Sequence, residues 1–173
     1  MTSLKVFFLS AAMAFAVFCS GTAMAAGKTD FELGVAGGAS LNGIKTTQFM
    51  VLGAWSRTLY PDLLLRAEPT FEVLSSDENT LYVGGASLVL RALAPYKTVT
   101  PFVDMGAGLN ATSSSHFDNR RLGGDFLFDL VLGGGVIVKD FSISYRYRHL
   151  SNAGIFKLNE GADSFYILLG YRL

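Results

Sequence analysis

The chain has 173 residues, half of them apolar, with 14 basic residues balanced by 14 acidic residues. This balance leaves no field of one sign, which excludes a protein that binds nucleic acid through a basic surface. Only one cysteine is present, and it lies near the N-terminus. A disulfide framework is therefore excluded.

Residues 1–25 are typical of a secretory signal peptide. Lys5 supplies the positive charge, an apolar stretch follows, and Ala23-Met24-Ala25 provides small residues for cleavage. We therefore expect a signal peptide over residues 1–25 and one domain over residues 26–173. The only cysteine, Cys19, would be removed with the signal peptide, which leaves no thiol chemistry to the mature chain.

The rest of the chain contains no run of about 18 apolar residues, the length that a membrane-spanning helix needs. It is nevertheless rich in apolar, aromatic and glycine residues. An apolar chain without such a run indicates a transmembrane β-barrel, in which only every second residue contacts lipid.

Eight segments of roughly ten residues alternate between apolar and polar side chains, which is the period of a β-strand. In the third segment, Leu65 and Phe71 alternate with Arg66 and Glu72. The segments are 30–40, 46–57, 63–74, 81–91, 98–111, 124–138, 141–150 and 163–173. The sequence therefore predicts an all-β fold, an eight-stranded antiparallel transmembrane β-barrel.

Charged residues gather on the polar faces of these segments. They are Glu68, Glu72, Asp104, Asp125 and Asp129, with Arg66, Arg146, Arg148 and Arg172. An eight-stranded barrel has an interior that side chains just fill, so we expect a plugged lumen and no pore. Short and long connections alternate along the chain, as they do in barrels of the bacterial outer membrane. With the N-terminus in the periplasm, the loop that begins at Ser151 faces outside.

The last two predicted strands place three candidate catalytic residues on one side. His149 and Asp163 share the apolar faces of these strands, and Ser151 continues the parity of His149. If the strands pair as a hairpin, the histidine can act as general base for the serine while the aspartate orients the imidazole. This position on the lipid-facing wall suits an enzyme that acts on a lipid.

Neighbouring residues extend the hypothesis and leave alternatives open. The side chain of Asn152 and the N–H of Gly154 are candidates for an oxyanion hole. Glu160 is a second candidate for the acid, although its parity points away from the shared face. A His-x-Ser pattern also arises by chance, and Ser-Asn-Ala-Gly is ordinary turn sequence. His116 reads as a solvated loop residue.

The segment from His149 to Gly154, together with the segment from Asn159 to Ser164, resembles the lipid A 3-O-deacylase (PagL) family of outer-membrane enzymes. The stretch from Pro101 to Gly108 is similar to a strand of that family. The resemblance is strongest over roughly residues 100–173. It implies hydrolysis of the ester that joins a 3-hydroxyacyl chain to the 3-position of lipid A, within lipopolysaccharide in the bacterial outer membrane.

The resemblance also implies roles for single residues. Ser151 would be the nucleophile, His149 the general base, Asp163 the orienting acid, and Asn152 with Gly154 the oxyanion contributors. No metal or organic cofactor is implied. The best-known relative has a glutamate where this chain has Asp163, so the sequence leaves open whether the shorter acid reaches His149.

Two other functions remain open at this stage. The first is a small barrel without catalytic activity that acts as an adhesin or stabilises the membrane. The second is a lipid A acyltransferase, whose pocket would lie inside the barrel, where this sequence places charges. The sequence also leaves open the acyl-chain preference, latency in the intact membrane and the formation of a homodimer.

Overall fold

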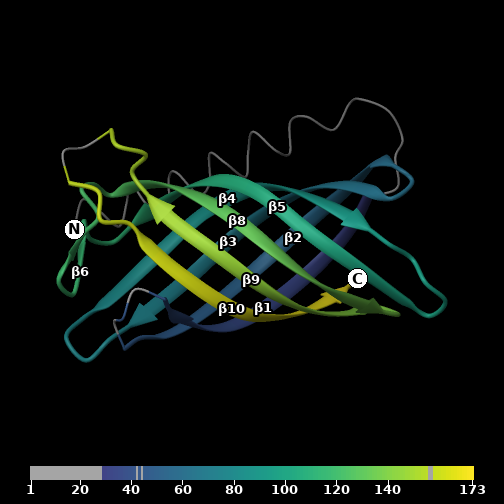
Figure 1. Cartoon of the computed structure of the whole chain (residues 1–173), viewed down its shortest axis with the longest axis horizontal. Helices are drawn as coiled ribbons and strands as arrows, with labels where there is room; N and C mark the ends of the chain where they lie inside the picture. The colour runs from purple at the N-terminus through teal and green to yellow at the C-terminus, as the bar shows by residue number, and fades with distance from the viewer. Residues whose placement is uncertain (1–28, 42, 44, 156–157) are drawn as a thin grey trace.

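The computed structural model describes residues 29–173 except residues 42, 44 and 156–157, so the predicted signal peptide lies outside the described part. These residues form a closed antiparallel barrel (Figure 1). The prediction of an all-β, eight-stranded fold is confirmed. In the described part of the chain, no helix is long and apolar enough to cross a membrane.

Each barrel strand pairs with its neighbour along the chain, and the last strand returns to the first. The barrel strands are β1 (Thr29–Ser40), β2 (Thr47–Tyr60), β3 (Leu63–Ser75), β4 (Thr80–Leu93), β5 (Val99–Thr112), β8 (Phe126–Val138), β9 (Phe141–Ser151) and β10 (Ala162–Arg172). Their bounds lie within a few residues of the predicted segments, because alternation of apolar and polar side chains marks each strand.

A short hairpin inside the loop between β5 and β8 was not predicted. Its strands are β6 (His116–Phe117) and β7 (Arg120–Arg121), and two-residue strands are too short to show a period. The longer loops, including this hairpin and the loop between β9 and β10, gather at one end of the barrel, at the left in Figure 1. We call this end the loop end. The tight turns and the C-terminus lie at the opposite end.

Charged side chains fill the lumen, as predicted, but four residues differ from the predicted set. Glu32 and Arg91 are buried there, whereas Asp125 is exposed before β8 and Arg172 is only half-buried at the end of β10. The buried charges are Glu32, Glu68, Glu72, Asp104 and Asp129 with Arg66, Arg91, Arg146 and Arg148. Each of these arginines is within ion-pair distance of at least one of the carboxylates.

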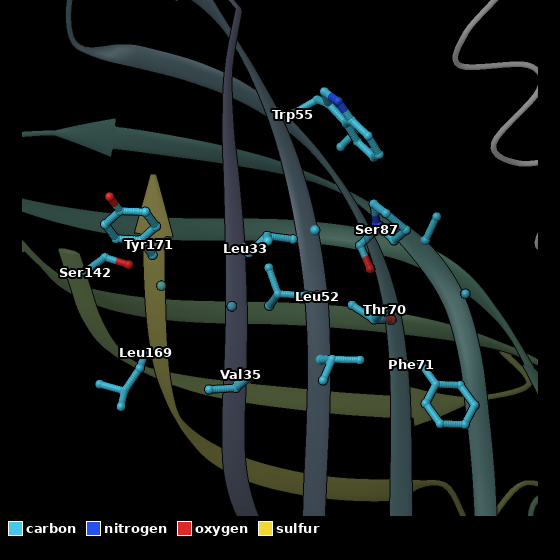
Figure 2. A pocket seen from close by; sticks show the side chains of 18 of the residues that line it. Leu33, Val35, Leu52, Trp55, Thr70, Phe71, Ser87, Ser142, Leu169 and Tyr171 are labelled. Carbon is cyan, nitrogen blue, oxygen red and sulfur yellow. The ribbon is translucent and has the colours of Figure 1, made fainter. Parts of the chain in front are cut away.

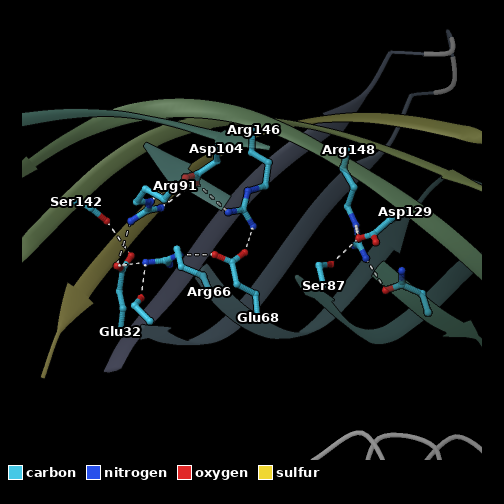
Figure 3. A network of polar contacts seen from close by, with 12 residues as sticks. Glu32, Arg66, Glu68, Ser87, Arg91, Asp104, Asp129, Ser142, Arg146 and Arg148 are labelled. Atoms are coloured by element: carbon cyan, nitrogen blue, oxygen red, sulfur yellow. Dashed lines mark hydrogen bonds and ion pairs between the residues drawn. The ribbon is translucent and has the colours of Figure 1, made fainter. Parts of the chain in front are cut away.

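The ion pairs in the lumen join strands that are far apart in the sequence (Figure 3). Arg66 bridges Glu32 at 3.0 Å and Glu68 at 2.8 Å. Glu68 also accepts from Arg146 at 2.7 Å, while Arg91 donates to both oxygens of Asp104 at 2.8 Å. A network in which each buried charge has a partner of opposite sign is the arrangement in which buried charges are tolerated. It fills the barrel and ties its walls together.

Arg148 anchors the wall directly behind the candidate site. Its guanidinium contacts Glu72, Asp129 at 3.0 Å and Asn110 at 2.5 Å. Ser87 donates to the same Asp129 at 2.9 Å. Because Arg148 precedes His149 in β9 and points inward, these bonds fix the backbone from which His149 points outward.

An apolar cap closes the lumen at the loop end. Phe117 and Leu122 from the hairpin loop pack with side chains of the barrel strands, namely Leu74, Leu81, Val83, Leu127, Leu150 and Ala162. Leu150 lies between His149 and Ser151 in the chain and is 1% exposed. The cap therefore supports the inner side of the wall that carries the candidate residues.

Candidate active site on the outer wall

His149 and Asp163 are directly opposed partners across β9 and β10. The carbonyl oxygen of Asp163 accepts from Leu41 N at 2.9 Å, so the backbone groups of Asp163 point toward β1 and away from β9. The His149–Asp163 pair is therefore the non-hydrogen-bonded kind, in which opposed side chains lie closest. Asp163 Oδ1 reaches His149 Nδ1 at 2.7 Å. The aspartate is long enough for this contact.

Tyr147 brings a second donor to the same carboxylate oxygen. It lies two residues before His149 on the same face of β9, and its hydroxyl donates to Asp163 Oδ1 at 2.6 Å. Sequence reasoning did not assign a role to Tyr147. Its parity, shared with His149, was the available signal, but aromatic residues on a lipid-facing wall are so common that the signal was not distinctive.

Ser151 is the last residue of β9 and continues the outward face of His149. Ser151 is paired with Phe128 of the neighbouring strand β8, and its side chain is half-buried. Residues two apart in a strand have Cα atoms separated by roughly 6.5 to 7 Å. No hydrogen bond joins the side chains of His149 and Ser151 in the described part of the chain. In structures without substrate, such catalytic contacts are often loose and tighten only in the complex.

Asn152 and Gly154 are engaged within the loop. The Asn152 side chain is fully buried, and Nδ2 donates to the carbonyl oxygens of Leu122 at 2.9 Å and Leu158 at 2.6 Å. Its Oδ1 accepts from Gly154 N at 2.8 Å. The N–H groups predicted for an oxyanion hole thus have partners here, and Gly154 N would have to leave Asn152 before it could serve one.

Glu160, the second candidate for the acid, points to another part of the loop. Its carboxylate accepts from Arg121 N at 2.5 Å, and its own N–H donates to Arg121 O at 3.2 Å. Arg120 donates to the carbonyl oxygens of Glu160 and Gly161. The structure therefore brings Asp163 to His149, while Glu160 braces the hairpin loop against the loop after β9. His116 is exposed; its ring nitrogen Nδ1 lies 3.0 Å from Ser115 Oγ, and its backbone N–H donates to Ser114 Oγ at 3.1 Å.

Gly161 forms the other boundary of the imidazole and was also missed by sequence reasoning. Its φ is 61°, a conformation that favours glycine. A Cβ atom at this position would lie 3.1 Å from His149 Cε1 and 3.1 Å from Leu150 O. The absence of a side chain at Gly161 therefore leaves room for the edge of the histidine ring that carries Cε1 and Nε2.

The polar candidates lie on an otherwise apolar wall. The side chains of His149 and Asp163 are 37% and 26% exposed, and their outward neighbours include Leu130 and Phe165. Polar groups on a lipid-facing surface are unfavourable unless they have a function or a partner. Here the histidine, aspartate and tyrosine partner one another.

A separate apolar pocket is lined by residues from all eight strands of the barrel, mostly from β1 to β4 (Figure 2). Its lining includes Leu33, Val35, Trp55, Phe71 and Leu169, and it does not include His149, Ser151 or Asp163. The pocket has no cluster of titratable groups along its described lining. It therefore contributes hydrophobic wall and no evident chemistry.

The arrangement around His149 can support proton transfer. A carboxylate at Nδ1 selects the tautomer in which Nδ1 carries the proton, which leaves Nε2 free to accept one. Ser151 lies on the same face, toward the loop end. This order of acid, imidazole and hydroxyl is the one required to activate a serine nucleophile.

Comparisons with known proteins identify the family. Residues 27–172 match the family model described as lipid A 3-O-deacylase (PagL). The chain is 33% identical over 72 residues to the lipid A deacylase PagL of Bordetella bronchiseptica, an alignment that covers 41% of this chain and 40% of that protein.

Solved structures show the same fold. The crystal structure of the outer membrane enzyme PagL superposes with a TM-score of 0.74 and 19% identity, covering 81% of this chain and 98% of that chain. The N-terminal β-barrel domain of Pseudomonas aeruginosa OprF superposes less closely, with a TM-score of 0.50 and 13% identity, over 86% of this chain and all of that chain.

Proposed function

Because the chain belongs to the lipid A 3-O-deacylase (PagL) family, we propose that it is an outer-membrane esterase that hydrolyses the 3-O-linked 3-hydroxyacyl chain of lipid A. Its substrate is lipid A within lipopolysaccharide, which reaches the outer wall of the barrel through the membrane. The observation that supports this proposal most directly is the 2.7 Å contact between His149 and Asp163 on the lipid-facing wall, next to Ser151.

The mechanism that we propose has two steps, transfer of the acyl chain to Ser151 and hydrolysis of the acyl-serine ester by water. Ser151 Oγ attacks the acyl carbonyl carbon while His149 Nε2 takes the hydroxyl proton. The tetrahedral intermediate collapses, the 3-oxygen of the sugar leaves with the proton from His149, and an acyl-serine ester remains. His149 Nε2 then takes a proton from water while the water oxygen attacks the acyl carbonyl carbon. The second tetrahedral intermediate collapses, Ser151 Oγ leaves with the proton from His149, and the free 3-hydroxy acid is released.

Asp163 holds the imidazole with Nε2 toward the serine and stabilises the imidazolium that forms in each step. Asn152 and Gly154 are the proposed oxyanion contributors, and the Gly154 N–H becomes available when it exchanges Asn152 Oδ1 for the developing oxyanion. The filled lumen supports a reaction on the outer wall, since a substrate chain has no room among the buried ion pairs.

The proposal is tested by mass spectrometry of lipid A from cells that express the chain, beside Ser151→Ala and His149→Ala variants shown to reach the outer membrane. We expect the parent to remove one 3-hydroxyacyl mass and both variants to leave lipid A unchanged. Ser142→Ala is a matched control, because Ser142 is a serine on the inner face of the same strand.

Three results would contradict the proposal. Unchanged lipid A with the parent, repeated on detergent-solubilised protein with several lipid A types, would favour a barrel without catalytic activity. A gain of acyl mass would favour an acyltransferase. Full activity of Ser151→Ala would place the nucleophile elsewhere.

A further inference from the structure

We infer that Tyr147 is a positioning residue for the reaction: its hydroxyl holds the Asp163 carboxylate in the orientation that serves His149. The inference rests on the proposed function, because it assigns a role within the same site. Two donors, Tyr147 Oη at 2.6 Å and His149 Nδ1 at 2.7 Å, meet on the single oxygen Asp163 Oδ1.

The environment gives the hydrogen bond its importance. Asp163 lies on a wall whose outward neighbours are apolar, and its side chain is only 26% exposed. A carboxylate in such surroundings needs donors, because water cannot fully solvate it. Charge-assisted hydrogen bonds of this kind are the stronger ones. Tyr147 therefore donates to the carboxylate from the side farther from the loop end, and His149 contacts the same carboxylate from the side nearer the loop end.

The geometry also restricts how the carboxylate can turn. Tyr147 is two residues before His149 on the same strand, so the phenol and the imidazole approach Asp163 from the same strand at two heights along the wall. Without the phenol, the carboxylate could rotate about its side-chain bonds and offer His149 a less favourable angle. With the phenol, one carboxylate rotamer accepts from both donors. The imidazole is consequently held in one tautomer and one orientation.

The aromatic ring of Tyr147 could instead serve only as hydrophobic wall. Tyr147→Phe separates the two roles, because it keeps the ring and removes only the hydroxyl. Tyr145→Phe is the matched control. Tyr145 lies two residues earlier on the same face, is 54% exposed and stacks on Phe165, but its hydroxyl has no hydrogen-bond partner among the described residues.

The first measurement is deacylation of lipid A by purified, detergent-solubilised enzyme. Loss of a hydrogen bond to a charged group should reduce kcat about ten- to hundredfold in Tyr147→Phe, with KM nearly unchanged. Tyr145→Phe should keep the parent rate. The effect should vanish in a double-mutant cycle: when Asp163 is already asparagine, the added Tyr147→Phe change should alter kcat by less than about twofold. Equal losses from Tyr147→Phe in both backgrounds would overturn the inference.

A second measurement does not depend on lipid A as the substrate. The rate at which an alkyl fluorophosphonate labels Ser151 reports the activation of the hydroxyl by His149. We expect Tyr147→Phe to slow this labelling as much as it slows kcat, while Tyr145→Phe leaves it unchanged. Labelling of Ser151 that is equally fast in the parent and in Tyr147→Phe would overturn the inference, even if the parent does not deacylate lipid A. If Tyr147→Phe slows labelling of Ser151 but the parent does not deacylate lipid A, the positioning role stands and the proposed substrate is wrong. An unlabelled Ser151 in the parent would overturn the role together with the proposed site.

Discussion

Asp163 Oδ1 contacts His149 Nδ1 at 2.7 Å across a non-hydrogen-bonded pair of β9 and β10, the kind of pair in which a short acid can reach its partner. We expect Asp163→Asn to reduce kcat by about 10³- to 10⁴-fold, because an amide can hold the imidazole in the wrong tautomer. Asp163→Glu should keep more activity, since it retains the carboxylate although the longer side chain must bend. Steady-state deacylation in detergent measures both. A fully active Asp163→Asn enzyme would remove Asp163 from the mechanism.

Glu160 provides the matched comparison for the acid. Its carboxylate accepts from Arg121 N and does not contact His149. Glu160→Gln keeps an acceptor oxygen for that bond, so the deacylation rate should stay within about twofold of the parent, as for most surface substitutions. A large loss of kcat in Glu160→Gln with normal stability would indicate that Glu160 takes part in orienting the histidine.

Gly161→Ala should push the imidazole out of place. The added Cβ would lie 3.1 Å from His149 Cε1, and the backbone there has a φ of 61°. A displacement of a catalytic group by a fraction of an ångström can reduce kcat by about ten- to hundredfold. Gly43→Ala is the control, because Gly43 has a φ of 79° and nothing within 4 Å of the added Cβ. It should share the backbone strain and keep the parent rate; equal losses of activity in both variants would refute the steric explanation.

Arg148→Ala should destabilise the barrel strongly. It would leave the buried carboxylates of Glu72 and Asp129 without their guanidinium partner. Removal of one member of a buried ion pair lowers the free energy of unfolding by about 3 to 5 kcal/mol. Urea unfolding in lipid vesicles, followed by tryptophan fluorescence, measures the change. Arg172→Ala, at a half-buried position at the end of β10, should lower it by less than about 1 kcal/mol.

Asn152→Ala should loosen the loop that follows Ser151. The side chain joins Leu122 O, Leu158 O and Gly154 N, and it is fully buried. We expect faster cleavage of residues 152–161 by an added protease and a lower deacylation rate. Asn79→Ala, in the exposed loop between β3 and β4, is the control and should change neither. Unchanged cleavage with a kcat about 10²- to 10³-fold lower would instead indicate a direct oxyanion contact.

Much of the fold could be predicted because the alternation of apolar and polar residues indicates both where the strands lie and which side chains point outward. His149, Ser151 and Asp163 were placed on the outer wall by the same parity. Contacts between side chains on neighbouring strands were harder to predict from the sequence, since the register between β9 and β10 decides whether Asp163 or Glu160 contacts the imidazole. Sequence patterns do not show that register directly. Tyr147 remained unassigned for the same reason: its hydroxyl matters only because Asp163 lies within its reach.

The lumen shows a similar limit. Arg91 was placed at the very end of a predicted strand, and Glu32 lies in a glycine-rich strand where alternation is weak, so neither was included among the interior charges. In the structure they belong to the same network, because Arg91 contacts Glu32 at 3.5 Å and Arg66 contacts it at 3.0 Å. Burial in a closed barrel depends on how far each strand extends, which its sequence pattern indicates only to within a few residues.

The bond from Leu41 N to Asp163 O lies at the seam where the first and last strands of the barrel join. Closure of the barrel between β1 and β10 therefore also holds the backbone of Asp163, the residue that we propose to orient the imidazole. In a chain whose seam is still open, the backbone of Asp163 lacks this bond, even where β9 and β10 have already paired. Full esterase activity should consequently appear only after the barrel has closed in the membrane. The unfolded chain should cross the periplasm without hydrolysing lipids.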